Sequence, residues 1–226
     1  MYATPAVIWP PDDTEESVLG TNLHQGTITN VRLGFNELAS TLAQPGQPPP
    51  WHALSQTTIR GLRRPDGSRY RVLPDVFIYR QHIDERRASL SLAADGPPLL
   101  IVEVASESTY QKDLDLVFGK GYSYAQAGVR EYLVIDPTGE FVPEGIRAWR
   151  LHDAVYRPWL PETTGRWHSQ EIAAAIVLEG IHVAVYTQDG RRMIREGEAA
   201  QALARKDKEL ADLRQQLEQL LHDRER

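Results

Sequence analysis

The sequence predicts an α/β domain with a mixed, buried central sheet flanked by helices, followed by a C-terminal helical arm. The segments "LLIVEVAS" (99–106) and "REYLVIDP" (130–137) are short, nearly unbroken apolar runs, typical of strands that are covered on both faces. A stretch with helical spacing separates them, so the three segments form a crossover unit whose two strands run parallel. After Gly197, apolar residues alternate at intervals of three and four, the rhythm of a coiled coil.

The composition excludes several classes of site. The chain has 226 residues, 41% of them hydrophobic, and no cysteine, so disulfides, thiolate metal sites and cysteine nucleophiles are ruled out. We find no apolar run of the length that a membrane span needs, and we expect a cytoplasmic protein. The formal net charge of −6 counts against a broad coat of nucleic acid. Five arginines nevertheless cluster in "IRGLRRPDGSRYR" (59–71), either as a solvated hairpin or as a local basic groove.

Three regions are expected along the chain. Residues 1–19 mix Pro, Asp and Glu without a period and predict a loose lead-in. Residues 20–195 form the domain, and its first element is an amphipathic helix over 20–44, ended by "PGQPPP". The apolar positions of this helix are Leu23, Ile28, Val31, Phe35, Leu38 and Leu42.

The middle of the chain predicts strands, one further helix, and hairpins. Two strands, over 53–62 and 69–80, flank the turn "RPDGS". After the buried strand 99–106, a helix is expected from Asp113 to Ala127, closed by Gly128. Hairpins are expected over 145–160 and 180–193. The predicted apolar face of the helix consists of Leu114, Val117, Phe118, Gly121, Tyr122 and Ala125.

Residues 197–226 predict a C-terminal helix that forms a coiled coil. This helix is too polar to be stable alone, so a partner helix is expected. Self-pairing into a homodimer is the first choice, and packing back on the body is the alternative. The a and d positions are Ala199, Leu203, Leu210, Leu213, Leu217 and Leu220, interrupted once by Lys206.

Two acids stand in apolar strands, and a buried carboxylate needs a cation. Asp75 follows Pro74, and Glu103 lies between two valines. If their strands are neighbours, both carboxylates and the Val104 carbonyl could bind one Mg²⁺ ion, which prefers oxygen ligands. Lys120, on the next helix, could then stabilise a phosphoryl transition state. The alternatives are a turn Asp, a Glu103 ion pair with an arginine of the hairpin, and a solvated lysine.

These segments together resemble the Uma2 family of endonucleases, which have the PD-(D/E)XK restriction-endonuclease-like fold. The likeness rests on "PDVFIYR" (74–80), "PPLLIVEVASEST" (97–109) and "GKGYSYAQAGVREYLVIDP" (119–137), and runs from about Gly20 to near residue 190. It implies that Asp75 and Glu103 bind Mg²⁺, with Mn²⁺ as a substitute. The lysine of the motif's name is Ala105 here, and the resemblance moves that role to Lys120. Asp113 matches an acid that follows Ser-Thr in the family.

The first functional hypothesis is therefore a Mg²⁺-dependent DNA endonuclease with Asp75, Glu103 and Lys120 as its catalytic residues. The alternative is a non-catalytic module that keeps the nuclease fold for DNA binding or for assembly through the coiled-coil arm. Three further residues were considered for the site, and each has a purely structural interpretation as well. His24 caps the first helix or touches substrate, Glu37 is solvated or approaches the metal, and Asp136 is a turn residue beside the site.

Overall fold

The computed structural model describes residues 22–193, 198, 204–210 and 213–214. The lead-in 1–19 and most of the arm 197–226, including Ala199, Leu203, Leu217 and Leu220, lie outside the described residues. Residues 204–210 are helical, and Leu210 and Leu213 are each 54% exposed, but the coiled coil remains a prediction. No helix among the described residues has both the length and the apolar character to cross a membrane.

A six-stranded mixed sheet forms the centre of the domain, with the order β1-β4-β6-β7-β8-β9. Strands β6 and β7 run parallel, as their sequences predict, and the other neighbours in this sheet are antiparallel. Two three-stranded sheets, β10-β11-β12 and β3-β2-β5, complete the fold. The elements are α1 (Asn22–Leu42), β1 (His52–Leu54), β2 (Thr58–Arg63), β3 (Arg69–Val72), β4 (Val76–Tyr79), β5 (Ser89–Ser91), α2 (Leu92–Asp95), β6 (Leu100–Val104), α3 (Tyr110–Leu114), α4 (Lys120–Ala127), β7 (Glu131–Ile135), β8 (Ile146–His152), β9 (Val155–Pro158), β10 (Trp167–His168), β11 (Ala174–Glu179) and β12 (His182–Thr187).

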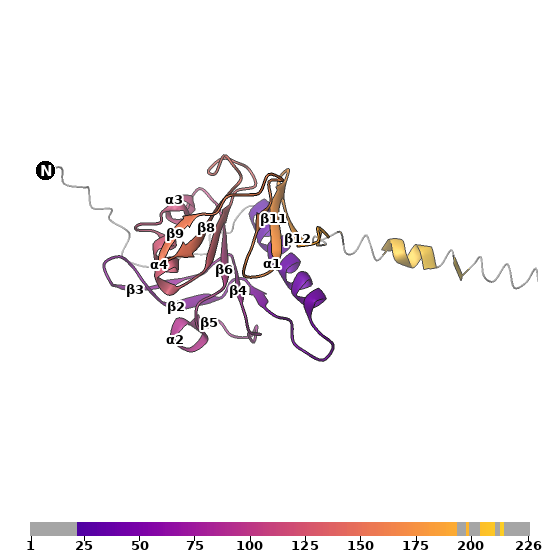
Figure 1. Cartoon of the computed structure of the whole chain (residues 1–226), viewed down its shortest axis with the longest axis horizontal. Helices are drawn as coiled ribbons and strands as arrows, with labels where there is room; N and C mark the ends of the chain where they lie inside the picture. Colours follow the sequence, from indigo (N-terminus) through magenta and orange to yellow (C-terminus); the bar gives the residue numbers. More distant parts are fainter. Residues whose placement is uncertain (1–21, 194–197, 199–203, 211–212, 215–226) are drawn as a thin grey trace, which may run out of the picture.

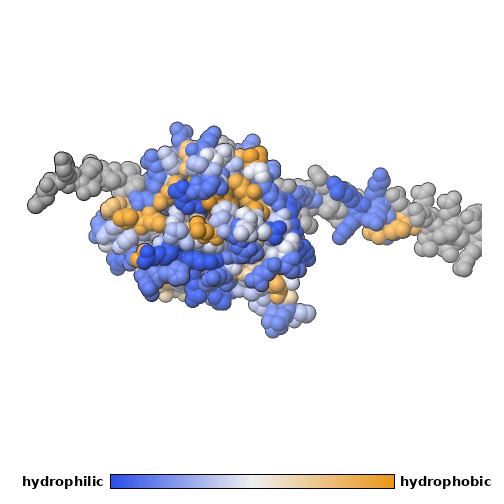
Figure 2. Space-filling view, turned by 45° about the horizontal axis from the view of Figure 1, so that its top comes forward, coloured by the Kyte–Doolittle hydropathy of each residue, from blue (hydrophilic) through white to orange (hydrophobic). Residues whose placement is uncertain are grey.

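The two faces of the central sheet pack against different partners. Figure 1 shows α1, β11 and β12 on one side of β4 and β6, and α3, α4, β2 and β3 on the other. Because side chains alternate along a strand, Val102 of β6 joins the core on the α1 side, whereas Ile101 joins the core on the α4 side. The outer surface is mostly hydrophilic, with apolar residues in separate small groups on the face that Figure 2 shows.

Helix α1 is the clearest success of the sequence prediction. Its buried residues include Ile28, Val31, Phe35 and Leu38, at the predicted spacing. Leu42 was expected on the same face, but it is 48% exposed because the helix ends there. α1 packs on β12 and on β1, so it joins the last described sheet to the central one.

The helix expected from Asp113 to Ala127 is wrong as a single element. The chain instead forms α3 and α4, separated by the segment 115–119. Val117 and Phe118, expected on the buried face, lie in that segment and are 59% and 55% exposed. Asp115 explains the break, since its Oδ1 accepts hydrogen bonds from the backbone N–H groups of Val117 (2.8 Å) and Phe118 (2.9 Å). These groups are therefore satisfied without a continuous helix.

The single strand expected over 69–80 is also divided. β3 ends at Val72 and β4 begins at Val76, and the two strands belong to different sheets. Pro74 lies at the division, where its lack of an N–H prevents a continuous ladder. The hairpin expected over 145–160 is confirmed as β8 and β9. Within 180–193, β12 pairs chiefly with β11, and the return segment contributes the isolated bridge Tyr186↔Arg192.

Two glycines of α1 offer a test of this packing. A methyl group at Gly34 would lie 2.9 Å from Cγ2 of Val185 on β12, whereas one at Gly26 would meet nothing within 4 Å. We expect Gly34→Ala to lower the free energy of unfolding by about 1–3 kcal/mol, because a stiff valine of the core would have to move. The matched control Gly26→Ala should raise it by about 0.5–1 kcal/mol through helix propensity. Urea denaturation measures both, and equal effects would contradict the close contact between α1 and β12.

Candidate active site

Asp75 and Glu103 lie side by side at the ends of neighbouring strands. Asp75 directly precedes β4, which pairs antiparallel with β6 from Val76↔Val102 onward. The Asp75 N–H points to Glu103 Oε2 at 3.4 Å, and Asp75 Oδ2 accepts a hydrogen bond of 2.7 Å from the Val104 N–H. The proximity expected of the two acids is therefore found, and the backbone of β6 itself orients the Asp75 carboxylate.

Glu103 is 1% exposed and points to the face of the sheet that α4 covers. Lys120, the first residue of α4, places its Nζ 3.4 Å from Glu103 Oε2. Tyr124, one turn later on the same helix, donates a 2.5 Å hydrogen bond to Glu103 Oε1. Residues four apart share a helix face, so this one turn of α4 supplies partners to both carboxylate oxygens.

Asp113 of α3 is a third acid at this position, and it is 1% exposed. Its Oδ1 lies 3.0 Å from Nζ of Lys120, which is itself 3% exposed. Burial raises the pKa of the Asp113 carboxyl, and the Lys120 ammonium opposes that rise without cancelling it. One ammonium therefore stands between two buried carboxylates, with Asp75 nearby, and the group carries excess negative charge.

The segment between α3 and α4 brings Lys120 back to Asp113. Gly119 allows this return, because a Cβ there would lie 2.2 Å from the Lys112 carbonyl oxygen. The backbone of the segment thus passes directly against the end of α3, at a distance that no side chain permits. The sequence predicted Asp113 and Lys120 on one continuous helix, from Asp113 to Ala127. They meet instead across two helices, through this glycine.

Ala105, at the position of the lysine in the motif's name, is buried at 8% exposed. It lies two residues after Glu103 and points to the same face of β6, the face that α4 covers. A side chain at 105 and a side chain from the start of α4 therefore enter the same space. Because Ala105 has only a methyl group, it leaves room in this space for the Lys120 side chain, which reaches Glu103 from α4.

His24 and Asp136 border the site from two sides. His24 Nε2 lies 3.8 Å from Asp75 Oδ1, so α1 contributes to the surroundings of this acid. A pocket of about 220 Å³ is lined in part by His24, Val104 and Asp136. Glu37 is thirteen residues further along α1, about 20 Å along the helix axis, and is not part of this group.

Asp136 acts as a turn residue, as its sequence favoured. Its Oδ1 accepts a hydrogen bond from the Thr138 N–H (3.0 Å), and its Oδ2 accepts from Phe141 (2.6 Å) and Val142 (2.9 Å). Burial alone would raise the pKa of the carboxyl, but the hydrogen bonds from Thr138, Val142 and Phe141 outweigh it, and the pKa is lowered. The carboxylate thus organises the β7–β8 connection rather than facing the other acids.

Asp75, Glu103 and the Val104 carbonyl make a donor set that fits a Mg²⁺ ion. Val104 lies beyond the last pair of the β4–β6 ladder, and its carbonyl points to the same side of β6 as its N–H, toward Asp75. Among the described residues, no three His, Cys, Asp or Glu side chains form a group that could hold a metal. Mg²⁺ does not need such a group, because it commonly binds one or two carboxylates and keeps several waters.

Sequence reasoning missed the contribution of Tyr124 and gave Asp113 no role at the site. The signal for Tyr124 was its position four residues after Lys120. The signal for Asp113 was weaker, because its burial depends on a chain reversal that no local pattern marks. Both residues hold Lys120 and Glu103 in place through the contacts described above.

Comparison with known proteins shows to which family the chain belongs. The Uma2 family model, described as a putative restriction endonuclease, matches residues 29–179, a range that includes Asp75, Glu103, Asp113 and Lys120. A search of curated proteins gave no match. The matched range covers the central sheet, α3 and α4, and it lies within the extent expected from the sequence motifs. The chain belongs to the Uma2 family.

Proposed function

We propose that the protein is a Mg²⁺-dependent DNA endonuclease that hydrolyses phosphodiester bonds at the Asp75–Glu103–Lys120 site. The observation that carries the proposal is the buried Lys120, ion-paired with Glu103 beside Asp75, in a chain of the Uma2 family. A carboxylate group with excess negative charge in a low-dielectric setting is stabilised by a divalent cation.

Each residue has a proposed role. Asp75, Glu103 and the Val104 carbonyl would hold the ion, which when bound would lower the pKa of a water molecule and neutralise phosphate charge. A water oxygen would form a bond to phosphorus and release one proton to solvent, one P–O ester bond would break, and the leaving oxygen would take up a proton from solvent. The Lys120 ammonium donates a hydrogen bond to the oxygens that gain charge as this happens. Asp113 and Tyr124 are positioning residues, because they contact Lys120 and Glu103 rather than the substrate.

A second candidate is the non-catalytic module, which would use the nuclease fold for DNA binding or assembly. Ala105 at the usual lysine position and the lack of a third metal-binding side chain among the described residues favour it. The two candidates differ in whether the protein binds a divalent ion and cuts DNA. The first experiment below measures both properties.

We predict that Glu103→Gln abolishes both metal binding and nicking. Wild type with Mg²⁺ or Mn²⁺ should nick supercoiled plasmid, and the variant should be slower by at least about 100-fold, since the carboxylate charge is gone. Mg²⁺ should raise the thermal unfolding midpoint of wild type but not of the variant. The matched control is Glu162→Gln, an exposed acid that does not line the pocket beside the site, and it should behave as wild type. Equal traces of nicking by wild type and Glu103→Gln would indicate a contaminating nuclease and would refute the proposed endonuclease activity.

We predict that Lys120→Gln keeps metal binding but loses cleavage by about 100-fold, because the donor to the transition state is removed. The change also leaves Glu103 and Asp113 without their shared cation, at a cost of about 3–5 kcal/mol. The double variant Lys120→Gln/Asp113→Asn removes one of those charges and should recover part of the lost stability without recovering cleavage. Urea denaturation and plasmid nicking are the readouts. Full cleavage by the folded double variant would exclude a catalytic role for Lys120.

We also propose that the chain forms a homodimer through residues 197–226. The exposed Leu210 and Leu213 and the spacing of the arm support pairing of two helices. Truncation after Arg195 should convert a dimer into a monomer in analytical ultracentrifugation. The body should keep its unfolding midpoint, because the described core residues all lie at or before Met193. A truncated body that stays dimeric would place the interface elsewhere.

A further inference from the structure

The β2–β3 hairpin carries four arginines on one exposed face. The register places Arg60 opposite Arg71 and Arg63 opposite Arg69, and all four are exposed. The other face of the hairpin packs into the core through Ile59, which is 1% exposed, and its neighbours. The alternation of the two strands, adjusted by an irregularity between Arg60 and Leu62, keeps all four guanidinium groups outside. We call these four residues the arginine face.

Like charges directly opposite each other on paired strands destabilise a hairpin. The arginine face contains two such pairs and, among the described residues, no ion pair to any of its four members. The segment 58–72 has one acid, Asp66, whose carboxylate accepts a hydrogen bond of 2.8 Å from the Ser68 N–H in the turn. An arrangement that repels itself, in a chain of net charge −6, is typical of a surface that binds an external anion.

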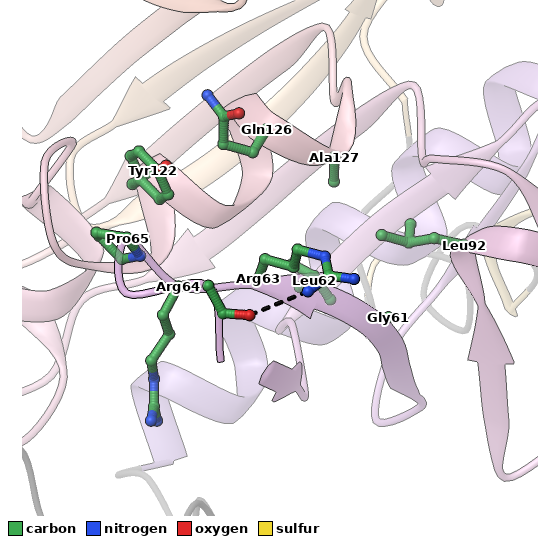
Figure 3. A pocket seen from close by; sticks show the side chains of 10 residues that line it. Gly61, Leu62, Arg63, Arg64, Pro65, Leu92, Tyr122, Gln126 and Ala127 are labelled. Carbon is green, nitrogen blue, oxygen red and sulfur yellow. Dashed lines mark hydrogen bonds between the residues drawn. The ribbon is translucent and has the colours of Figure 1, made fainter. Parts of the chain in front are cut away.

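A pocket of about 400 Å³ lies at the tip of the hairpin, between the hairpin and α4. Figure 3 shows Arg63, Arg64 and Pro65 on one side of it and Tyr122, Gln126 and Ala127 on the other. Arg63 donates a 3.0 Å hydrogen bond to the Gly67 carbonyl oxygen, which fixes its guanidinium at the rim. Its remaining N–H groups, with the Gln126 amide and the Tyr122 hydroxyl, are donors of the kind that contact nucleic-acid phosphates.

The arginine face is close to the candidate active site. Arg71 is four residues before Asp75, so their Cα atoms are at most about 14 Å apart. A duplex carries about eight phosphates over that length of its axis. α4 makes the same connection, since it begins with Lys120 in the site and reaches the pocket at Gln126. One bound duplex could therefore touch both places.

We infer that the arginine face binds the phosphate backbone of double-stranded DNA and holds it against the active site. The two arginine pairs are separated by about 7 Å along β3, so they match successive charges of a polyanion rather than one small anion. The arginines contact phosphates and carry no base-edge readout, so this binding is independent of sequence. The inference rests on the proposed nuclease function for the choice of DNA as the polyanion.

The experiment measures binding apart from cleavage. Fluorescence anisotropy of a labelled DNA duplex, in EDTA and over a series of NaCl concentrations, gives the slope of log affinity against log salt. Each phosphate contact adds about 0.9 to that slope, so Arg60→Gln/Arg71→Gln and Arg63→Gln/Arg69→Gln should each reduce it by about 1.8. Removal of like-charge pairs should leave the unfolding midpoint unchanged or higher, which shows that the variants are folded. The matched control is Arg157→Gln/Arg191→Gln, two exposed arginines outside the hairpin, with an unchanged slope.

The outcomes separate this inference from the nuclease itself. Unchanged slopes in both hairpin variants, or no binding of duplex DNA by wild type, would overturn it even if plasmid is nicked. Tighter binding of an RNA duplex, with the same arginine dependence, would overturn the choice of DNA. Reduced slopes in a protein that fails to nick would support the arginine face and count against the proposed catalysis alone.

Discussion

The burial of Lys120 between Glu103 and Asp113 is the constraint on which the rest of the site depends. None of the three groups is more than 3% exposed, so none could remain charged at this depth without the others. Their meeting requires α4 to lie over β6, α3 to end before it, and Gly119 to pass against the Lys112 carbonyl. The proposed divalent cation would offset the negative charge that Asp75 adds to this group.

The two faces of the central sheet differ in how they surround this group of charged residues. The α1 side of the central sheet is a packed apolar core, whereas the α4 side mixes a second core with the buried charges. β4 and β6 bring Asp75 and Glu103 together at the sheet, and the hairpin β2–β3, which directly precedes β4 in the chain, carries four exposed arginines. The proposed metal, the proposed substrate surface and the ammonium are thus positioned by adjacent elements.

The sequence predicted the elements whose signal is local. α1 and the parallel pair β6 and β7 follow from periodicity and apolar runs, and the structure has them. The closeness of Asp75 to Glu103 was expected only if their strands are neighbours, and β4 and β6 do pair. The break between α3 and α4 was not predictable in this way. Val117 and Phe118 look like core residues, and only the side-chain bonds of Asp115 and the contact of Gly119 reveal otherwise.

The positions of these residues along the chain bear on how the site assembles during folding. Glu103, Asp113, Lys120 and Tyr124 all belong to the unit from β6 to β7, and the partners are separated by few residues. Contacts of such short separation close small loops and tend to form early. Asp75 arrives from outside that unit, when β4 pairs with β6. A chain that has built only the local unit therefore holds the lysine and two carboxyl groups but lacks Asp75, which only the pairing of β4 with β6 brings to the site.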